Sequence, residues 1–164
     1  MTKEQYIKIT EPMRSDPEKT KRIVSLNQIF TGLVFMVYPL YLVVLYLEKD
    51  PKLMRAVLVP AVSFVLVTVF RKIMNLPRPY EKFQIPPVIE KDTKGKSFPS
   101  RHVFSVFIIA VTIFCSHPGP GVLIALIGVG MAVIRVLGGV HEPKDVIVGA
   151  VLGLVCGMVG FYIL

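Results

Sequence analysis

The sequence predicts an all-α, integral-membrane helical bundle with about five transmembrane helices and an N-terminal interfacial helix. Hydrophobic residues make up 53% of the 164 residues and charged residues only 18%, which is too apolar for an ordinary soluble domain. The apolar residues also lie in long runs. A run of about 20 residues can cross roughly 30 Å of hydrocarbon as a helix. Composition and run length together therefore predict a membrane protein.

Five apolar runs are the predicted transmembrane helices. They cover residues 29–47, 53–70, 103–116, 121–139 and 146–164. The third run is short unless its helix begins near Ser100, which would put Arg101 and His102 in the first turn, at the membrane interface. The chain is therefore expected to be a multi-pass protein of the cell membrane.

Two polar segments complete the predicted organisation. Residues 1–28 form an N-terminal interfacial segment in which Ser15 and Glu18 have capping-box spacing, so a helix is expected to begin near Asp16 and to continue into the first span. Residues 29–164 form the membrane domain. Within it, the proline-rich loop 71–99 is expected to cap one membrane face, because prolines interrupt a continuous helix.

Small residues recur in the last run. Gly149, Gly153 and Gly157 are spaced four apart and predict a bare helical stripe that another backbone can approach closely. The stripe can pack inside the bundle or form the seam of a homodimer, and the sequence leaves both open.

The formal charge of +8 follows the membrane topology and not a nucleic-acid-binding pattern. With five spans, the N-terminus and the loops 71–101 and 135–144 share one face, which holds sixteen Lys or Arg residues against three on the other. Removing five that could serve chemistry leaves eleven against three. Cytoplasmic loops carry the excess of basic residues, so this face is expected to be cytoplasmic. Membrane lipids, and no nucleic acid, are the expected partners.

Three polar clusters, residues 71–79, 99–102 and 135–145, interrupt the apolar chain, all on this face. The basic residues among them that are expected to bind phosphate are Arg71, Lys72, Arg78, Arg101 and Arg135. Guanidinium groups grip phosphate oxygens in pairs, and several together repel one another unless an anion is bound. Ser100 can cap the third span and donate a hydroxyl hydrogen bond. The clusters therefore predict a phosphate site, although any one arginine alone would more often be a headgroup anchor.

Two histidines and an aspartate add reactivity to this set. His102 and His141 titrate near neutral pH, so one can attack phosphorus while the other protonates a leaving oxygen. Asp145, four residues after His141, can orient that imidazole. The chemistry implied is phosphoryl transfer through a phosphohistidine, with no metal and no cofactor expected. A zinc-protease interpretation of "HEPKD" fails because Pro143 breaks the helical spacing and the second histidine is missing.

The three clusters resemble, in order and spacing, the signature of the type 2 phosphatidic acid phosphatase superfamily. That signature is lysine, six residues, arginine-proline; then proline-serine-glycine-histidine; then serine-arginine, five residues, histidine, three residues, aspartate. In this chain Arg71 precedes Arg78-Pro79 by seven positions, Pro99 to His102 matches the second element, and Arg135, His141 and Asp145 match the third.

The resemblance implies a lipid phosphatase with His141 as nucleophile, Asp145 as its orienting residue and His102 as the acid for the leaving group. The phosphate would be held by Arg71, Arg78, Ser100, Arg101 and Arg135, with Lys72 able to contribute beside Arg71. Three positions depart from the signature: Arg71 replaces lysine, Arg101 replaces glycine and Ile134 replaces serine.

The expected substrates are lipid phosphomonoesters or pyrophosphates of the phosphatidylglycerophosphate, phosphatidic acid or undecaprenyl pyrophosphate classes. The competing hypothesis is a non-enzymatic transporter of lipid phosphates or anions, or an inactive scaffold of the same fold. The departure at Arg101 is its best support, whereas the lack of a convincing internal repeat argues against a transporter.

Overall fold

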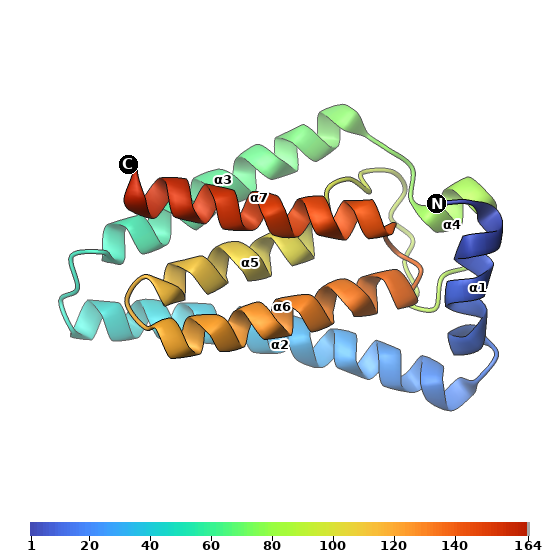
Figure 1. Ribbon diagram of the computed structural model, residues 1–164, viewed down its shortest axis with the longest axis horizontal. Helices are drawn as coiled ribbons and strands as arrows, with labels where there is room; N and C mark the ends of the chain where they lie inside the picture. The colour runs from blue at the N-terminus through green and yellow to red at the C-terminus, as the bar shows by residue number, and fades with distance from the viewer. Residues whose placement is uncertain (164) are drawn as a thin grey trace.

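The computed structural model describes residues 1–163, and within them it contains seven α-helices and no β-strand. The helices are α1 (Lys3–Arg14), α2 (Pro17–Leu47), α3 (Leu53–Met74), α4 (Pro79–Phe83), α5 (Arg101–Phe114), α6 (Pro118–Leu137) and α7 (Pro143–Tyr162). The long helices run side by side, and α1 and α4 lie together at one end of the bundle (Figure 1). The last residue of the predicted span 146–164 lies outside the described residues.

The predicted all-α membrane bundle is confirmed, with one adjustment to the number of full-length spans. Four segments are long and apolar enough to cross a membrane, namely α2, the segment Leu53–Phe83 that contains α3, α6 and α7. The fifth apolar helix, α5, has only 14 residues and is the most buried. It packs mainly against α6 and α7 and also touches α2 and α3. The chain is thus a multi-pass membrane protein whose shortest apolar helix is its core.

Helix α2 begins where the sequence predicted, but Asp16 caps it, and not Ser15. Asp16 Oδ1 accepts hydrogen bonds from the backbone N–H groups of Glu18 and Lys19, at 3.0 and 3.2 Å. Ser15 instead donates its hydroxyl to the Glu11 carbonyl, at 2.8 Å. The N-terminal segment also contains a separate helix, α1, and the expected boundary at residue 28 falls inside α2.

The glycine stripe of α7 packs against α5 inside one chain. A Cβ atom at Gly149 would lie 2.7 Å from the Ser100 carbonyl oxygen, and one at Gly153 would lie 2.6 Å from that of Phe104. At Gly157 it would lie 2.8 Å from Val111. Only glycine permits this approach of two helix backbones. The stripe is therefore covered by α5 and does not form a free surface for the homodimer that the sequence left open.

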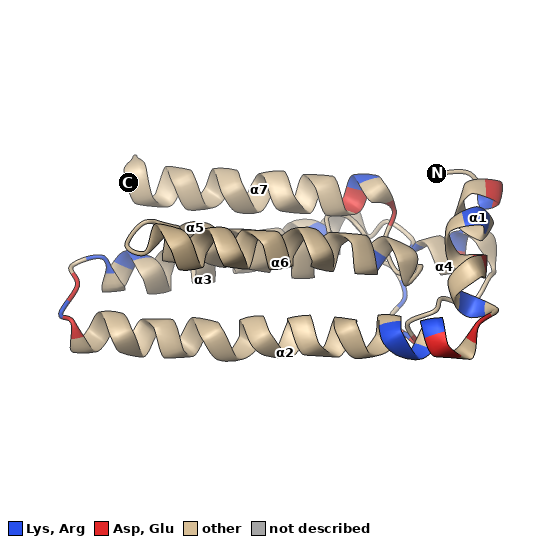
Figure 2. Cartoon of the chain, turned by 60° about the horizontal axis from the view of Figure 1, so that its bottom comes forward, with Lys and Arg blue, Asp and Glu red and all other residues tan. Residues whose placement is uncertain are grey.

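Charge is segregated along the bundle as the membrane requires. Figure 2 shows Lys, Arg, Asp and Glu gathered at the two ends, with more at the α1 end, and a long uncharged middle. Large hydrophobic side chains point outward over this middle; Phe35 and Ile73, for example, are 78% and 76% exposed. Such a band costs free energy in water and is stabilised by lipid chains.

Candidate active site

All three polar clusters meet at one end of the bundle. The C-terminal ends of α3 and α6, the N-terminal ends of α5 and α7, and the loop 84–100 converge there, beside α1 and α4 (Figure 1). Six of the predicted site residues are buried or nearly so: Arg71, Arg78, Ser100, Arg135, His141 and Asp145. The structure therefore brings together residues that are up to 74 positions apart in the sequence.

His141 and Asp145 form the expected pair. His141 lies in the turn before α7, and Asp145 lies in its first turn, so that Asp145 Oδ2 is 3.4 Å from His141 Nδ1. The same oxygen accepts the backbone N–H of Glu142, at 3.1 Å. Burial, opposed by the Asp145 hydrogen bond and assisted by the nearby Arg78 and Arg135, lowers the pKa of His141 to about 4. His141 is consequently neutral at pH 7, and Nε2, its second ring nitrogen, is left for other chemistry.

Ser97 belongs to this network, although the sequence did not single it out. Its hydroxyl donates to Asp145 Oδ2 at 2.6 Å and lies 3.4 Å from His141 Nδ1. Ser97 is buried in the loop before α5, three residues before Ser100. Because the loop brings it to Asp145 across 48 sequence positions, no local pattern could have identified it.

Two buried polar groups at the site have no hydrogen-bond partner among the described residues. They are Ser100 Oγ and Arg135 Nε. Ser100 is the residue before α5, but its side chain does not cap that helix as the sequence predicted; its backbone N–H donates to the Asp145 carbonyl oxygen, at 2.8 Å. Buried polar groups are nearly always hydrogen-bonded, so two unpaired donors at the polar end of the bundle are suited to binding an anion.

The structure places Arg71 against the loop before α5, and its predicted contact with phosphate stays a prediction. Its guanidinium donates to the backbone carbonyl oxygens of Lys96, Ser97 and Pro99, including Ser97 at 3.2 Å. It therefore holds the loop that carries Ser97 and Ser100, and most of its donors face protein carbonyls. This explains physically why an arginine can replace the lysine of the signature: the planar fork reaches several carbonyls at once.

Arg78 is only partly engaged by the protein. Its Nε donates to the Gly95 carbonyl and its Nη1 to that of Val140, both at 3.2 Å. Among the described residues, its Nη2 donates no hydrogen bond, so this nitrogen is available for an oxygen of a ligand. Lys72 is exposed on α3, so Arg71, and not Lys72, turns toward the site.

Arg101 and His102 lie at the polar end of an apolar groove. The groove has a volume of about 580 Å³, and its lining comes from α2, α3, α5 and α6, including Phe35, Tyr38 and Phe64. The Arg101 guanidinium lies over the Phe64 ring, 5.2 Å from its centroid. Arg101 therefore replaces the glycine of the signature with a cation that faces the groove.

The turn before His141 is supported from outside by α1. Gly139 has φ of +71°, and a Cβ there would lie 2.5 Å from the Tyr6 hydroxyl oxygen. Tyr6 donates that hydroxyl to the Gly139 carbonyl oxygen at 3.2 Å. Ile134, where the signature has serine, is buried with Ile89 and Val140 under the loop, so an apolar side chain fits there.

Metal ligands are not grouped at this end. Within residues 1–163, no set of three or more His, Cys, Asp or Glu side chains is placed to hold a metal ion. The expectation of metal-independent chemistry stays a prediction.

The known proteins that are similar to this chain include one sequence relative and two solved structures. The chain is 32% identical over 134 residues to the bacitracin transport permease protein BcrC of Bacillus licheniformis; the match covers 78% of this chain and 66% of that protein, just under two thirds of its length. The chain is also similar to the crystal structure of Aquifex aeolicus LpxE, with 25% identity and a TM-score of 0.74; the match covers 96% of this chain and 92% of that one.

The second structure has the same fold at lower identity. It is the first transmembrane PAP2 type phosphatidylglycerolphosphate phosphatase from Bacillus subtilis, with 18% identity, a TM-score of 0.73 and coverage of 96% of this chain and 83% of that one. The model of the PAP2 superfamily matches residues 52–164, which include every residue of the three polar clusters. The chain belongs to the PAP2 superfamily.

Proposed function

We propose that this protein is a metal-independent membrane lipid phosphatase that hydrolyses a phosphomonoester or pyrophosphate on a lipid headgroup through a phosphohistidine at His141. The observation that carries the proposal is the position of the apolar groove, which ends at Arg101 and His102 beside the buried polar cluster. A lipid tail can lie in such a groove within the bilayer while its headgroup reaches the arginines.

The nucleophilic step follows from the His141 environment. His141 is neutral at pH 7, and its Nδ1 is directed toward Asp145, so Nε2 carries the free electron pair. Attack by Nε2 forms a P–N bond as the P–O bond to the leaving group breaks. A proton from His102 goes to the leaving oxygen. Water then attacks phosphorus, the P–N bond breaks, His102 regains a proton and inorganic phosphate leaves.

The arginines would stabilise the charge that develops on phosphorus oxygens. Arg135 has an unpaired buried Nε, Arg78 has an uncommitted terminal nitrogen, and the Ser100 hydroxyl lacks a partner. Donors already fixed in a buried site stabilise a transition state without reorganising. Arg71 would act indirectly, by holding the loop that carries Ser97 and Ser100.

The substrates to test are phosphatidylglycerophosphate, phosphatidic acid and undecaprenyl pyrophosphate. A second candidate function is transport of a lipid phosphate or anion, because the similar Bacillus licheniformis protein is named a transport permease. Release of inorganic phosphate by purified protein separates the two functions, since a transporter would release none.

The decisive experiment replaces His141 with Ala and measures phosphate release in detergent with EDTA present. His117→Ala is the matched control, because His117 lies in the turn between α5 and α6, and the site lies at the other ends of those helices. We expect no measurable turnover for His141→Ala and near-normal turnover for the control. Turnover by His141→Ala equal to that of the control would rule out the covalent mechanism.

We further propose that the site faces the cytoplasm, since the site end carries the larger number of basic residues. Single cysteines at Lys94, in the loop over the site, and Lys49, in the turn between α2 and α3, test this in a background without Cys115 and Cys156. A membrane-impermeant maleimide added to intact cells should label the Lys49→Cys protein only. Labelling of Lys94→Cys alone would reverse the orientation.

A further inference from the structure

One cation at the site is absent from the family signature. Lys91 lies on the loop 84–100. Hydrogen bonds hold this loop near the site on both sides of Lys91. On one side, the backbone N–H groups of Val88 and Ile89 both donate to the Gly138 carbonyl oxygen, at 3.1 Å. On the other, the Tyr80 hydroxyl donates to the Thr93 carbonyl oxygen, at 2.5 Å. Lys91 is therefore presented by a fixed piece of backbone and not by a free loop.

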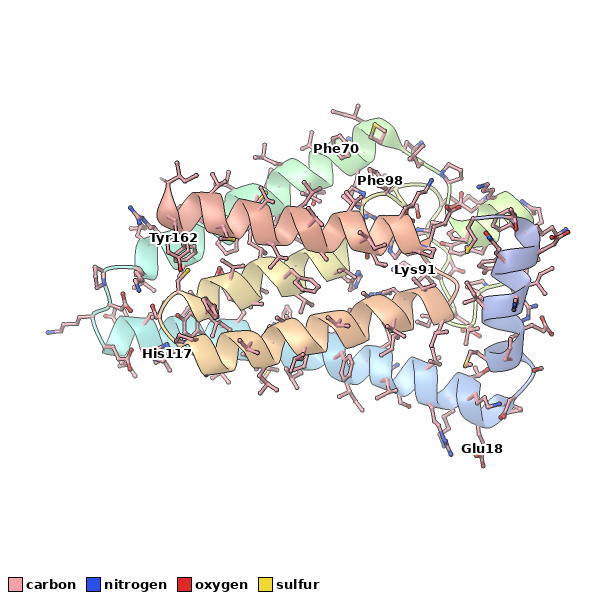
Figure 3. The ribbon with its side chains drawn as sticks, viewed as in Figure 1. Glu18, Phe70, Lys91, Phe98, His117 and Tyr162 are labelled. Carbon is pink, nitrogen blue, oxygen red and sulfur yellow. The ribbon has the colours of Figure 1, made fainter. Side chains whose placement is uncertain are left out.

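The Lys91 side chain turns inward while its neighbours do not. It is half-buried, whereas Glu90 and the three residues 92–94 are exposed. Figure 3 shows Lys91 between the ends of α6 and α7, at the end of the bundle where the three polar clusters meet. A long cationic side chain that leaves water in this way loses hydration and side-chain entropy, and this cost has to be offset by a partner.

Residues 1–163 provide no carboxylate that would offset this cost. Among the described residues, no carboxylate forms an ion pair with Lys91. Burial, followed by the positive charges of four arginines, lowers the pKa of Lys91 to about 8; the arginines are Arg135, Arg78, Arg101 and Arg71. An ammonium group placed among guanidinium groups is repelled by all of them unless a polyvalent anion is bound.

Burial indicates the side of the site on which Lys91 lies. Lys91 and His102 are both half-buried, whereas the proposed nucleophile His141 and the neighbouring Arg78 and Arg135 are buried. Lys91 therefore lies on the more open side of the site, as His102 does, and not on the buried side that holds the nucleophile. A cation there meets negative charge beyond the reacting phosphorus.

We propose that Lys91 is a substrate-contacting residue that binds anionic charge on the leaving-group side of the reacting phosphorus. This inference rests on the proposed phosphatase function, in which His102 marks the leaving-group side. Lys91 would favour substrates whose leaving group carries a further phosphate or other anion, and it would contribute little to binding the phosphoryl group that is transferred.

Two inorganic probes separate the leaving-group side from the transferred group. Pyrophosphate carries a second phosphate and orthophosphate does not. Their dissociation constants are measured by calorimetry on detergent-solubilised full-length protein carrying His141→Ala, so that pyrophosphate is not hydrolysed. Lys91→Met is compared in this background with Lys91→Arg and with Lys94→Met, a matched change of an exposed lysine in the same loop.

We expect Lys91→Met to weaken pyrophosphate binding about tenfold, in keeping with loss of one charge-assisted contact, and orthophosphate binding less than about threefold. Lys91→Arg should retain most of the affinity for pyrophosphate, and Lys94→Met should change neither. Lys91→Met leaves the backbone hydrogen bonds of the loop in place, so its thermal unfolding temperature should match that of the parent.

Equal losses for both anions, or losses no larger than those of Lys94→Met, would overturn the assignment of Lys91. So would undetectable binding of both anions by the parent. Phosphate release by the unsubstituted enzyme is measured separately. Its absence would refute the proposed function and the inference together, whereas normal release with no selective effect of Lys91→Met would refute the inference alone.

Discussion

Replacing Ser97 with Ala tests whether the hydroxyl found beside Asp145 positions the nucleophile. The Ser97 hydroxyl is the nearest of the donors to Asp145 Oδ2, at 2.6 Å, compared with 3.1 Å for Glu142 N and 3.4 Å for His141 Nδ1. Its loss leaves the carboxylate with two longer contacts. The imidazole should then be held less firmly in the orientation that directs Nε2 outward.

The size of the effect follows from the kind of bond removed. Hydrogen bonds to charged groups contribute about 1.5–3 kcal/mol, and about 1.4 kcal/mol corresponds to a tenfold change in rate. Because two donors to Asp145 remain, we expect the lower end, a fall in kcat of about tenfold. Ser97 touches the carboxylate and not the substrate, so KM should change less than about threefold.

The assay measures phosphate release against lipid concentration in mixed micelles. Ser116→Ala is the matched control, because Ser116 also donates its hydroxyl to a carboxylate, Asp50, at 3.1 Å, in the turn at the other end of the bundle. In an Asp145→Asn background, Ser97→Ala should have little further effect, since the two side chains act as one unit. A kcat for Ser97→Ala within twofold of that for Ser116→Ala would refute the reasoning.

Three further predictions follow from burial, helix packing and the support of the His141 turn. Because the pKa of His141 is lowered, an NMR titration of its imidazole nitrogens should show a midpoint near pH 4. The contribution of the neutral ring to the stability of the fold should be lost as the pH falls from about 6.5 toward 4. A midpoint near pH 6.5 would contradict this prediction. Gly153→Val should lower the thermal unfolding temperature in detergent, because overpacking against α5 costs about 1–3 kcal/mol or more. Gly32→Ala is the control, since a Cβ atom at Gly32 meets nothing within 4 Å. Equal unfolding temperatures for the two variants would be inconsistent with the close packing of α5 and α7. Tyr6→Phe removes the hydroxyl that donates to the Gly139 carbonyl oxygen and should reduce kcat by up to about tenfold. The helix content measured by circular dichroism should not change. Full activity would show that α1 does not support the turn before His141.

Much of the fold was predictable because hydropathy is a local property. Whether a run of residues is apolar enough for lipid can be judged from the run itself, and the start of α2 next to Asp16 depends on neighbouring residues only. The limits of local reasoning appear at α5. Its 14 residues are surrounded by other helices, so it does not need the length of a lipid-exposed span.

The sequence by itself determined the membrane class, the three polar clusters and the pairing of His141 with Asp145, because a residue in the turn before a helix lies close to a residue in its first turn. Only the tertiary structure decided what the remaining polar groups contact. Arg71 donates to loop carbonyl oxygens and Ser97 donates to Asp145, in both cases between segments distant in the chain. Lys91 is half-buried on the same loop, whereas its neighbours are exposed. The same holds for the glycine stripe, which is covered by α5. Hydrogen-bond and packing partners depend on how segments fold together, and no spacing within one segment specifies them.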